Sequence, residues 1–385
     1  MRMYRFMIGL SLACTMMATA QQSVFPVERQ SYLRTDICYQ MWRIEGSQFV
    51  VSQLSFPLML YVPFSDKLSM TVTHVPAYSQ WGSDYTVKGL SDTWIQGTYL
   101  SGNERWTLNL GMGVPTGKTR LTNNQLFFTQ YILSQNVYNF RLPMYGQGFC
   151  LKAGGAFAYP ITQKIVLGIG GQYLMRTAYH PASYTYDFRS QGRNTVKETD
   201  VKYKPGNELT AQAGLDYSAG ENIKFMLDVM YTRYERDVLE KEEIYGSGEK
   251  IAVMGGMYYQ YNEQYVWVFF TDRLKGKFEL LRGLSFEQAE KNLTGAQLDV
   301  GVVWKAINFR EGMFYILGDG RFYERNQNEK AGATVYGGGF ALDIKLSAKT
   351  VMNARIKYMA GSLKDAELTR NAEGMELGGG LQFSL

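Results

Sequence analysis

The sequence predicts an all-β protein, a transmembrane antiparallel β-barrel of about 14–16 strands with short periplasmic turns and long extracellular loops. Three observations predict it. Segments of about ten residues alternate apolar and polar side chains, the connections between them alternate long and short, and the last amphipathic strand ends at the carboxyl terminus. A tilted strand of about 9–11 residues crosses a bilayer, so these segments have the required length.

The amino terminus has the features of an export signal. Arg2 and Arg5 precede an uncharged apolar stretch at residues 6–17, and Ala18-Thr19-Ala20 forms an A-x-A cleavage site. The stretch is shorter than the ~20 residues that a spanning helix needs. We therefore expect residues 1–20 to be removed during export, and the mature protein to lie in the outer membrane of a Gram-negative bacterium.

Residues 21–385 are expected to form a single barrel domain. They contain no long apolar run, which excludes a spanning helix and leaves a closed barrel as the membrane-spanning form. The chain has 40 Lys and Arg, two of them in the signal, against 35 Asp and Glu, so the mature net charge is +3. This small charge argues against a nucleic-acid partner. The expected partners are the lipid bilayer, the barrel-assembly machinery and a small-molecule solute, and the oligomeric state is open.

The period-two alternation is clearest in the last strand. Met375, Leu377, Leu381, Phe383 and Leu385 share one face, and polar residues or glycine occupy the other. Similar segments predict sixteen strands, or fourteen if residues 21–61 partly form a periplasmic arm or a lumen plug. The predicted strands are 36–44, 48–61, 67–76, 91–100, 104–114, 147–159, 163–176, 207–218, 222–235, 249–260, 265–271, 294–305, 312–323, 332–344, 349–360 and 373–385.

The connections between these strands form two groups. The long ones all fall at one end of the predicted barrel, at 77–90, 115–146, 177–206, 236–248, 272–293, 324–331 and 361–373. The short ones fall at the other end, near 63–66, 101–103, 160–162, 219–221, 261–264, 308 and 345–348. A soluble sandwich has no reason to place every long loop at one end, whereas a transmembrane barrel does.

Ionisable residues occupy the polar face of several predicted strands. The functional interpretation is a charged path that selects solutes, and the alternative is an ion-paired interior that only keeps the lumen solvated. Both interpretations fit the lumen-lining candidates, which are Lys152, Lys224, Glu208, Asp216, Asp228, Asp299, Arg355, Lys357 and Glu376.

Residues that carry catalysis or bind metals are scarce. The chain has two histidines, His74 and His180, in distant segments, and no cluster with the ligand spacing of a zinc site. Cys38 and Cys150 are expected to be free thiols that face the lumen. We therefore predict no catalytic residues, no metal, no cofactor and no enzymatic activity.

Loop 115–146 has the clearest pattern of the connections. Thr122 is a helix N-cap candidate, and Phe127/Tyr131 and Phe128/Ile132 are spaced by four residues, as on one face of a helix. A short amphipathic helix over the barrel mouth would place this face in the lumen as a constriction, or offer it to an apolar ligand. Phe127, Phe128, Tyr131 and Ile132 are therefore the gate or ligand candidates.

Three segments resemble known outer-membrane proteins. The strand 110–114 followed by Pro115-Thr116-Gly117 resembles the MetA-pathway or phenol-degradation transporter barrels, relatives of the long-chain fatty-acid channel group. Segments 141–148 and 203–208 are similar to uncharacterised outer-membrane proteins of Gram-negative anaerobes. The resemblance implies passive uptake of small hydrophobic or aromatic solutes. The alternative function is a non-conducting structural or surface-interaction barrel that acts through its long extracellular loops.

Overall fold

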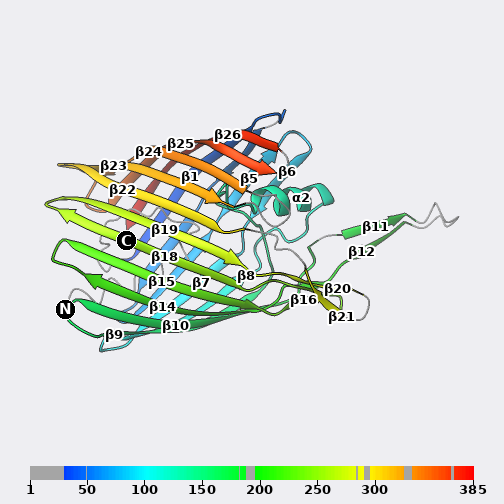
Figure 1. Cartoon of the computed structure of the whole chain (residues 1–385), viewed down its shortest axis with the longest axis horizontal. Helices are drawn as coiled ribbons and strands as arrows, with labels where there is room; N and C mark the ends of the chain where they lie inside the picture. Colours follow the sequence, from blue (N-terminus) through cyan, green and yellow to red (C-terminus); the bar gives the residue numbers. More distant parts are fainter. Residues whose placement is uncertain are drawn as a thin grey trace.

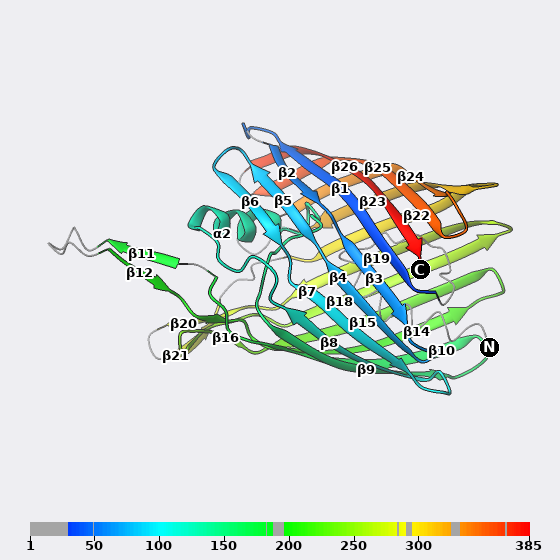
Figure 2. The same cartoon turned by 180° about the vertical axis from the view of Figure 1, so that it is seen from behind.

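The computed structural model describes residues 30–48, 50–181, 183–187, 196–282, 285–289, 295–324, 332–365 and 368–385. The predicted signal at 1–20 lies outside these residues. The chain forms a closed antiparallel barrel of sixteen wall positions (Figures 1 and 2). The ring closes where β1 (Tyr32–Ile44) pairs with β26 (Leu368–Ser384) in continuous register from Tyr32↔Ser384 to Ile44↔Ala372. Within the described residues, no helix is both long and apolar enough to cross a membrane.

Three neighbouring wall positions are each occupied by two shorter strands in line. These are β2 (Val50–Ser55) with β3 (Leu58–Pro63), β4 (Leu68–His74) with β5 (Pro76–Trp81), and β6 (Tyr85–Leu90) with β7 (Thr93–Leu100). Pro57 and Pro76 lie at the first two breaks, where the missing amide hydrogen interrupts the ladder. Hydrogen bonds bridge the breaks: Phe56 N donates to Pro76 O at 2.9 Å, and Ser91 N donates to Val75 O at 2.9 Å.

Single strands fill the other wall positions. In chain order after β7 they are β8 (Trp106–Val114), β9 (Cys150–Pro160), β10 (Ile165–Arg176), β14 (Glu208–Ser218), β15 (Ile223–Tyr234), β18 (Lys250–Tyr261), β19 (Gln264–Lys275), β22 (Gln297–Phe309), β23 (Gly312–Tyr323), β24 (Gly332–Lys345) and β25 (Thr350–Asp365). Apolar side chains alternate outward, as Trp106, Leu108 and Leu110 do on β8, and their exposure is what a lipid-facing surface requires.

Some segments that the sequence predicted as loops are strands, because wall strands are longer than a bilayer crossing requires. β5 and β6 form a hairpin within the predicted loop 77–90, and β25 and β26 extend through most of 361–373. These two strands have 16 and 17 residues, more than the ~9–11 that cross the membrane. The first strand pair, which the fourteen-strand alternative removed from the wall, lies in the wall.

Long loops build additional structure at the end opposite the carboxyl terminus (Figure 1). β13 (Tyr203–Lys204), β16 (Arg236–Leu239), β17 (Glu242–Gly246), β20 (Glu279–Arg282) and β21 (Ser285–Gln288) pair into a separate five-stranded sheet. β11 (Ser183–Asp187) and β12 (Val196–Asp200) form a hairpin at the same end. The end with the long loops is the extracellular end of an outer-membrane barrel.

Candidate functional site: a loop inserted in the barrel lumen

The connection between β8 and β9, residues 115–149, enters the barrel and is called here the inserted loop. Its first regular element is α2 (Asn123–Phe128), whose N-cap Thr122 forms a capping box with Gln125. Thr122 is the N-cap that the sequence predicted. A single π-helical turn, η1 (Thr129–Leu133), follows. Residues 134–149 have no regular structure, and those between Val137 and Tyr145 pack against the inner wall. The inserted loop therefore occupies lumen space rather than covering the mouth alone.

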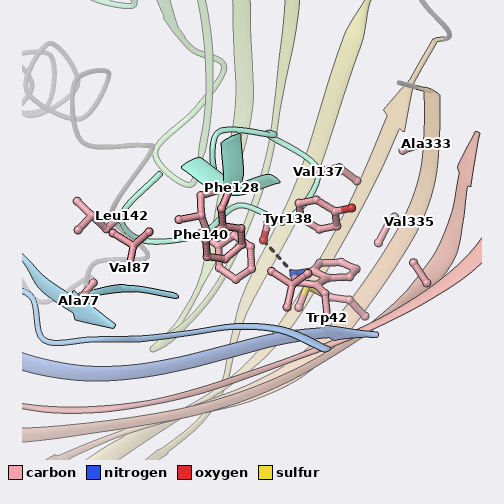
Figure 3. Packing of buried hydrophobic residues seen from close by; sticks show 14 of the residues in the cluster. Trp42, Ala77, Val87, Phe128, Val137, Tyr138, Phe140, Leu142, Ala333 and Val335 are labelled. Atoms are coloured by element: carbon pink, nitrogen blue, oxygen red, sulfur yellow. Dashed lines mark hydrogen bonds between the residues drawn. The ribbon is translucent and has the colours of Figure 1, made fainter. Parts of the chain in front are cut away.

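An apolar cluster joins the inserted loop to the inner wall (Figure 3). The loop contributes Phe128, Leu133, Val137, Tyr138, Phe140, Leu142 and Tyr145, all buried. The wall contributes Trp42, Val51, Ala77, Val87, Tyr323, Ala333, Val335, Met359 and Ala372 from the strands between β23 and β6 around the closed ring. Burial of this apolar surface favours the inserted position.

The four gate candidates lie on two sides of the helical segment. Phe128 is fully buried in the cluster, and Ile132 packs against it. Phe127 and Tyr131 are 42% and 59% exposed, and their ring centroids lie 4.8 Å apart. Phe127 also contacts Tyr85 of β6, with centroids 5.9 Å apart. The i,i+4 pairs therefore do not share one face, and only Phe128/Ile132 points into the protein.

Wall side chains satisfy the backbone of the inserted loop, which has no strand partner inside the lumen. Gln40 donates to Asn139 O at 2.9 Å and accepts from Arg141 N at 2.9 Å. Gln53 donates to Leu142 O at 2.9 Å and accepts from Leu142 N at 2.8 Å. Because buried backbone groups without partners are costly, these two amides fix the depth of the loop.

Two aromatic residues add further hydrogen bonds between the inserted loop and the wall. Trp42 Nε1 donates to Tyr138 O at 3.1 Å, the bond drawn in Figure 3. Tyr145 contacts Val87 O at 3.0 Å and Ser79 Oγ at 3.0 Å. Burial raises the pKa of Tyr145 to about 12, so its hydroxyl stays protonated and donates to the carbonyl.

The two ends of the inserted loop meet at a narrow neck, defined by Thr116-Gly117 and Gly146-Gln147. The Asp92 carboxylate accepts Gly117 N at 3.0 Å and Gln147 N at 2.6 Å. A Cβ atom added to Gly117 would lie 2.6 Å from Gly146 Cα, and one added to Gly146 would lie 2.7 Å from Gly117 C. Only glycine allows this approach, which gives Gly117 of the Pro-Thr-Gly segment a physical role.

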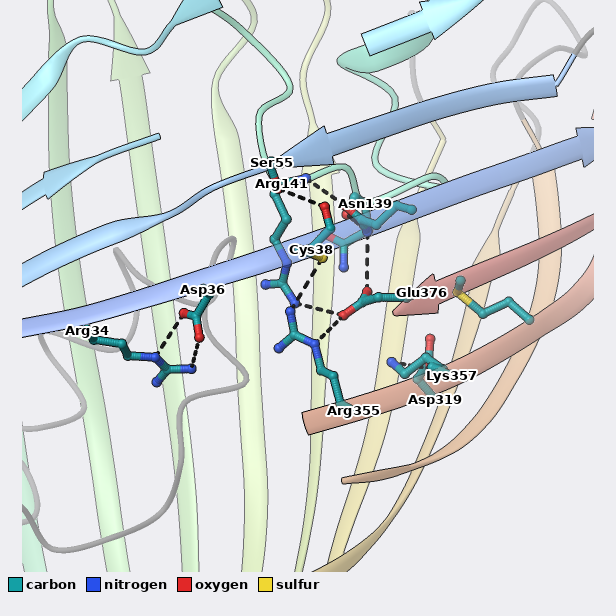
Figure 4. Close-up of polar contacts among 12 residues, drawn as sticks. Arg34, Asp36, Cys38, Ser55, Asn139, Arg141, Asp319, Arg355, Lys357 and Glu376 are labelled. Carbon is teal, nitrogen blue, oxygen red and sulfur yellow. Dashed lines mark hydrogen bonds and ion pairs between the residues drawn. The ribbon is translucent and has the colours of Figure 1, made fainter. Parts of the chain in front are cut away.

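Ion pairs lie below the inserted loop, on the inner wall (Figure 4). Glu376 Oε1 contacts Arg141 Nη2 of the loop at 3.0 Å and Arg355 Nε at 2.7 Å. Asp319 contacts Lys357 Nζ at 2.7 Å and Arg321 Nη2 at 3.4 Å. Arg321 also donates to Val137 O of the loop. These contacts connect the loop with β23, β25 and β26.

Two lumen cavities border the residues that the structure describes. The larger, about 350 Å³, lies beside Asn136, Asn139 and Arg141 of the loop and is bounded by β1, by β18 and β19, and by β22 to β26. The smaller, about 160 Å³, lies against β7 to β10, β14, β15 and β18, where glycine, threonine and amide side chains form most of the surface. Lys250 lines both cavities, so they are neighbours.

The lumen-lining candidates distribute over this interior. Asp299, Arg355, Lys357 and Glu376 line the larger cavity, and Lys152 and Glu208 line the smaller one. Glu208 pairs with Arg176, and Asp299 pairs with Arg273. Asp216, Asp228 and Lys224 lie on the lumen side of β14 and β15, outside both cavities, and the lack of a side chain at Gly214 leaves space for the Asp228 carboxylate. Cys38 and Cys150 are free and buried.

Sequence reasoning missed the residues that hold the loop. The strand period predicts that Gln40, Trp42 and Gln53 face the lumen, because they alternate with outward residues on β1 and β2. It does not predict which loop groups they contact. Arg141 and Arg321 carried no signal apart from charge. Among the described residues, no group of three or more His, Cys, Asp or Glu side chains is placed to hold a metal ion.

The chain matches no protein-family model and no curated protein sequence. Solved barrels are similar to it over most of its length. A TodX mutant, a monoaromatic hydrocarbon channel, has a TM-score of 0.45 at 8% identity over 93% of this chain and 91% of its own. A bacterial polysaccharide outer-membrane secretin has 0.47 at 9% over 93% and 99%. A Rhodopseudomonas blastica porin mutant has 0.40 at 13% over 92% and 100%. The architecture of the chain is that of an outer-membrane β-barrel.

Proposed function

We propose that the protein is an outer-membrane channel for passive uptake of small solutes, in which the inserted loop is the constriction. The observation that supports this most is the position of residues 137–145 inside the barrel, fixed to one half of the wall by Gln40, Gln53 and Trp42. The other half, lined by small and amide side chains, borders a cavity. Solutes would pass between the loop and this half, or after the loop moves.

Solutes with hydrophobic or aromatic groups fit the larger cavity. Trp267, Phe269, Val303 and Leu317 line it, and the last two belong to a buried apolar cluster inside the barrel with Tyr265 and Tyr315. A lumen built only to remain solvated has no need of such a surface. This supports the sequence-based expectation of hydrophobic or aromatic solutes.

A second function is a non-conducting barrel that acts at the cell surface. Two observations favour it: the apolar cluster that joins the inserted loop to the wall, and the five-stranded sheet that the extracellular loops build. In this case the inserted loop would seal the lumen permanently, and the extracellular sheet would contact a partner.

Solute flux into proteoliposomes distinguishes the two. We would compare the wild-type protein with two deletions, one lacking residues 122–135 and one in which Gly-Gly replaces 119–144, with swelling in arabinose as the measurement. A channel gives measurable swelling for the wild type, a small rise for the first deletion, and a larger rise for the second, which also removes residues 137–144. Absence of swelling in the wild type and both deletions, with the barrel still folded by heat-modifiable gel mobility, would refute the proposed channel.

A further inference from the structure

The larger cavity carries an excess of positive charge. Seven basic side chains line it against four acidic ones. One of the basic residues, Arg34, pairs with Asp36 just outside the lining, which leaves an excess of two positive charges. The excess lies next to the inserted loop rather than at an open surface, so solvent ions screen it only in part.

This excess comes from two carboxylates that are each shared by two cations. Glu376 contacts Arg141 and Arg355 at 3.0 and 2.7 Å, and Asp319 contacts Lys357 and Arg321 at 2.7 and 3.4 Å. No side chain in the two groups is more than 15% exposed. Each group therefore retains one buried positive charge, and a bound anion would offset the cost of that burial.

One side of the cavity is apolar. Trp267, Phe269, Val303 and Leu317 come from β19, β22 and β23, whereas the shared-carboxylate groups come from β23, β25, β26 and the loop. A ligand with one anionic end and one apolar body matches this division.

We infer that the larger cavity binds a compact organic anion, with its carboxylate among Arg141, Arg355 and Lys357 and its aromatic or aliphatic body against Trp267 and Phe269. The inference rests on the proposed channel function and names its solute class. The volume of about 350 Å³ is within the range of small-molecule sites, roughly 300–1,000 Å³.

The site is coupled to the inserted loop through Arg141. This residue belongs to the loop, and its partner Glu376 belongs to the wall. A bound carboxylate that accepts a hydrogen bond from Arg141 competes with Glu376 for the Arg141 guanidinium, and so weakens one contact that holds the loop. Cys38, fully buried with Arg355 Nη2 3.6 Å from its sulfur, reports on this region because reagents reach it only when the loop moves.

Calorimetric titration of the full-length protein in detergent tests the site, with benzoate as the probe. Benzyl alcohol and inorganic phosphate are comparison ligands. Benzoate should bind, and benzyl alcohol and phosphate should each bind at least about tenfold more weakly, because each lacks either the charge or the apolar body. Lys357→Gln should weaken benzoate about tenfold. Lys364→Gln, on the same strand but outside the cavity, should not.

Equal affinity for benzoate and benzyl alcohol, or unchanged benzoate affinity in Lys357→Gln, would overturn the inference. If phosphate binds as tightly as benzoate, the claim that the apolar body of the ligand contributes to binding is overturned. If Lys357→Gln does not fold, the three-ligand comparison on the wild type still decides.

Reaction of Cys38 with N-ethylmaleimide tests the coupling, in a Cys150→Ser background. Benzoate should raise the rate severalfold, and benzyl alcohol should leave it unchanged. An unchanged rate at saturating benzoate would refute the coupling. Neither measurement depends on conductance. If the protein conducts but does not bind benzoate, this inference fails and the proposed function stands. If the protein binds benzoate but passes no solute, the proposed function fails and the binding site stands.

Discussion

Gln40 and Gln53 show how single side chains determine the position of a loop that lacks secondary structure. Each amide supplies one donor and one acceptor, and each meets a backbone carbonyl and a backbone amide of residues 139–142. Their orientation toward the lumen follows from strand periodicity. Their partners, about 90 to 100 residues away in the chain, do not follow from any local pattern.

Replacement of Gln53 by Leu should destabilise the protein. The Leu142 amide and carbonyl lose their partner in a buried setting, at a cost of about 1–3 kcal/mol for the unsatisfied groups. Denaturant unfolding of the refolded protein measures this. Gln96→Leu, a lumen position that borders the smaller cavity away from the loop, is the matched control. An equal loss in both variants would show that Gln53 has no particular role in holding the loop.

At the scale of elements, the sequence predicted the strands well because their alternation is a local property. The alternating segments that became β8, β14, β22 and β26 illustrate this. The sequence did not predict the wall positions that hold two strands in line. The breaks at Pro57 and Pro76 depend on neighbouring strands that are interrupted at the same height of the wall, which no local pattern indicates. The short helix was foreseen from Thr122 and its spaced aromatic residues, whereas the entry of residues 137–145 into the lumen was not, because that segment has no period.

The neck should be intolerant of side chains. Gly146→Val places carbon atoms where Gly117 now lies, with the first already at 2.7 Å from Gly117 C. The two ends of the loop must separate, which breaks the Asp92 contacts and moves the loop. In a Cys150→Ser background, maleimide labelling of Cys38 should be faster than in the parent.

Gly220→Val is the control for Gly146→Val, because nothing lies within 4 Å of a Cβ at Gly220. Labelling of Cys38 that is equally slow in both variants, with the barrel folded, would contradict the role of the neck.

At the scale of the whole molecule, the separation of long and short connections assigns the two ends of the barrel. The β16–β17 turn at residues 240–241 belongs to the sheet at the long-loop end, and the turn at 219–222 belongs to the other. An epitope inserted after Lys241 should be accessible to antibody on intact cells. One inserted after Gly220 should be accessible only after the outer membrane is opened, and the reverse result would invert the topology.

The account of the whole molecule depends on the claim that the inserted loop occludes the lumen. Single-channel recording in planar bilayers tests this most directly, comparing the wild type with the variant in which Gly-Gly replaces residues 119–144. Gly146 N donates to Lys118 O at 3.0 Å, so a three-residue turn of the two glycines and Tyr145 closes the gap while Asp92 keeps its neck contacts. We predict small or infrequent openings for the wild type and a larger, stable conductance for the variant. Equal conductance in the two proteins, with both barrels folded, would place the loop outside the permeation path and contradict the account.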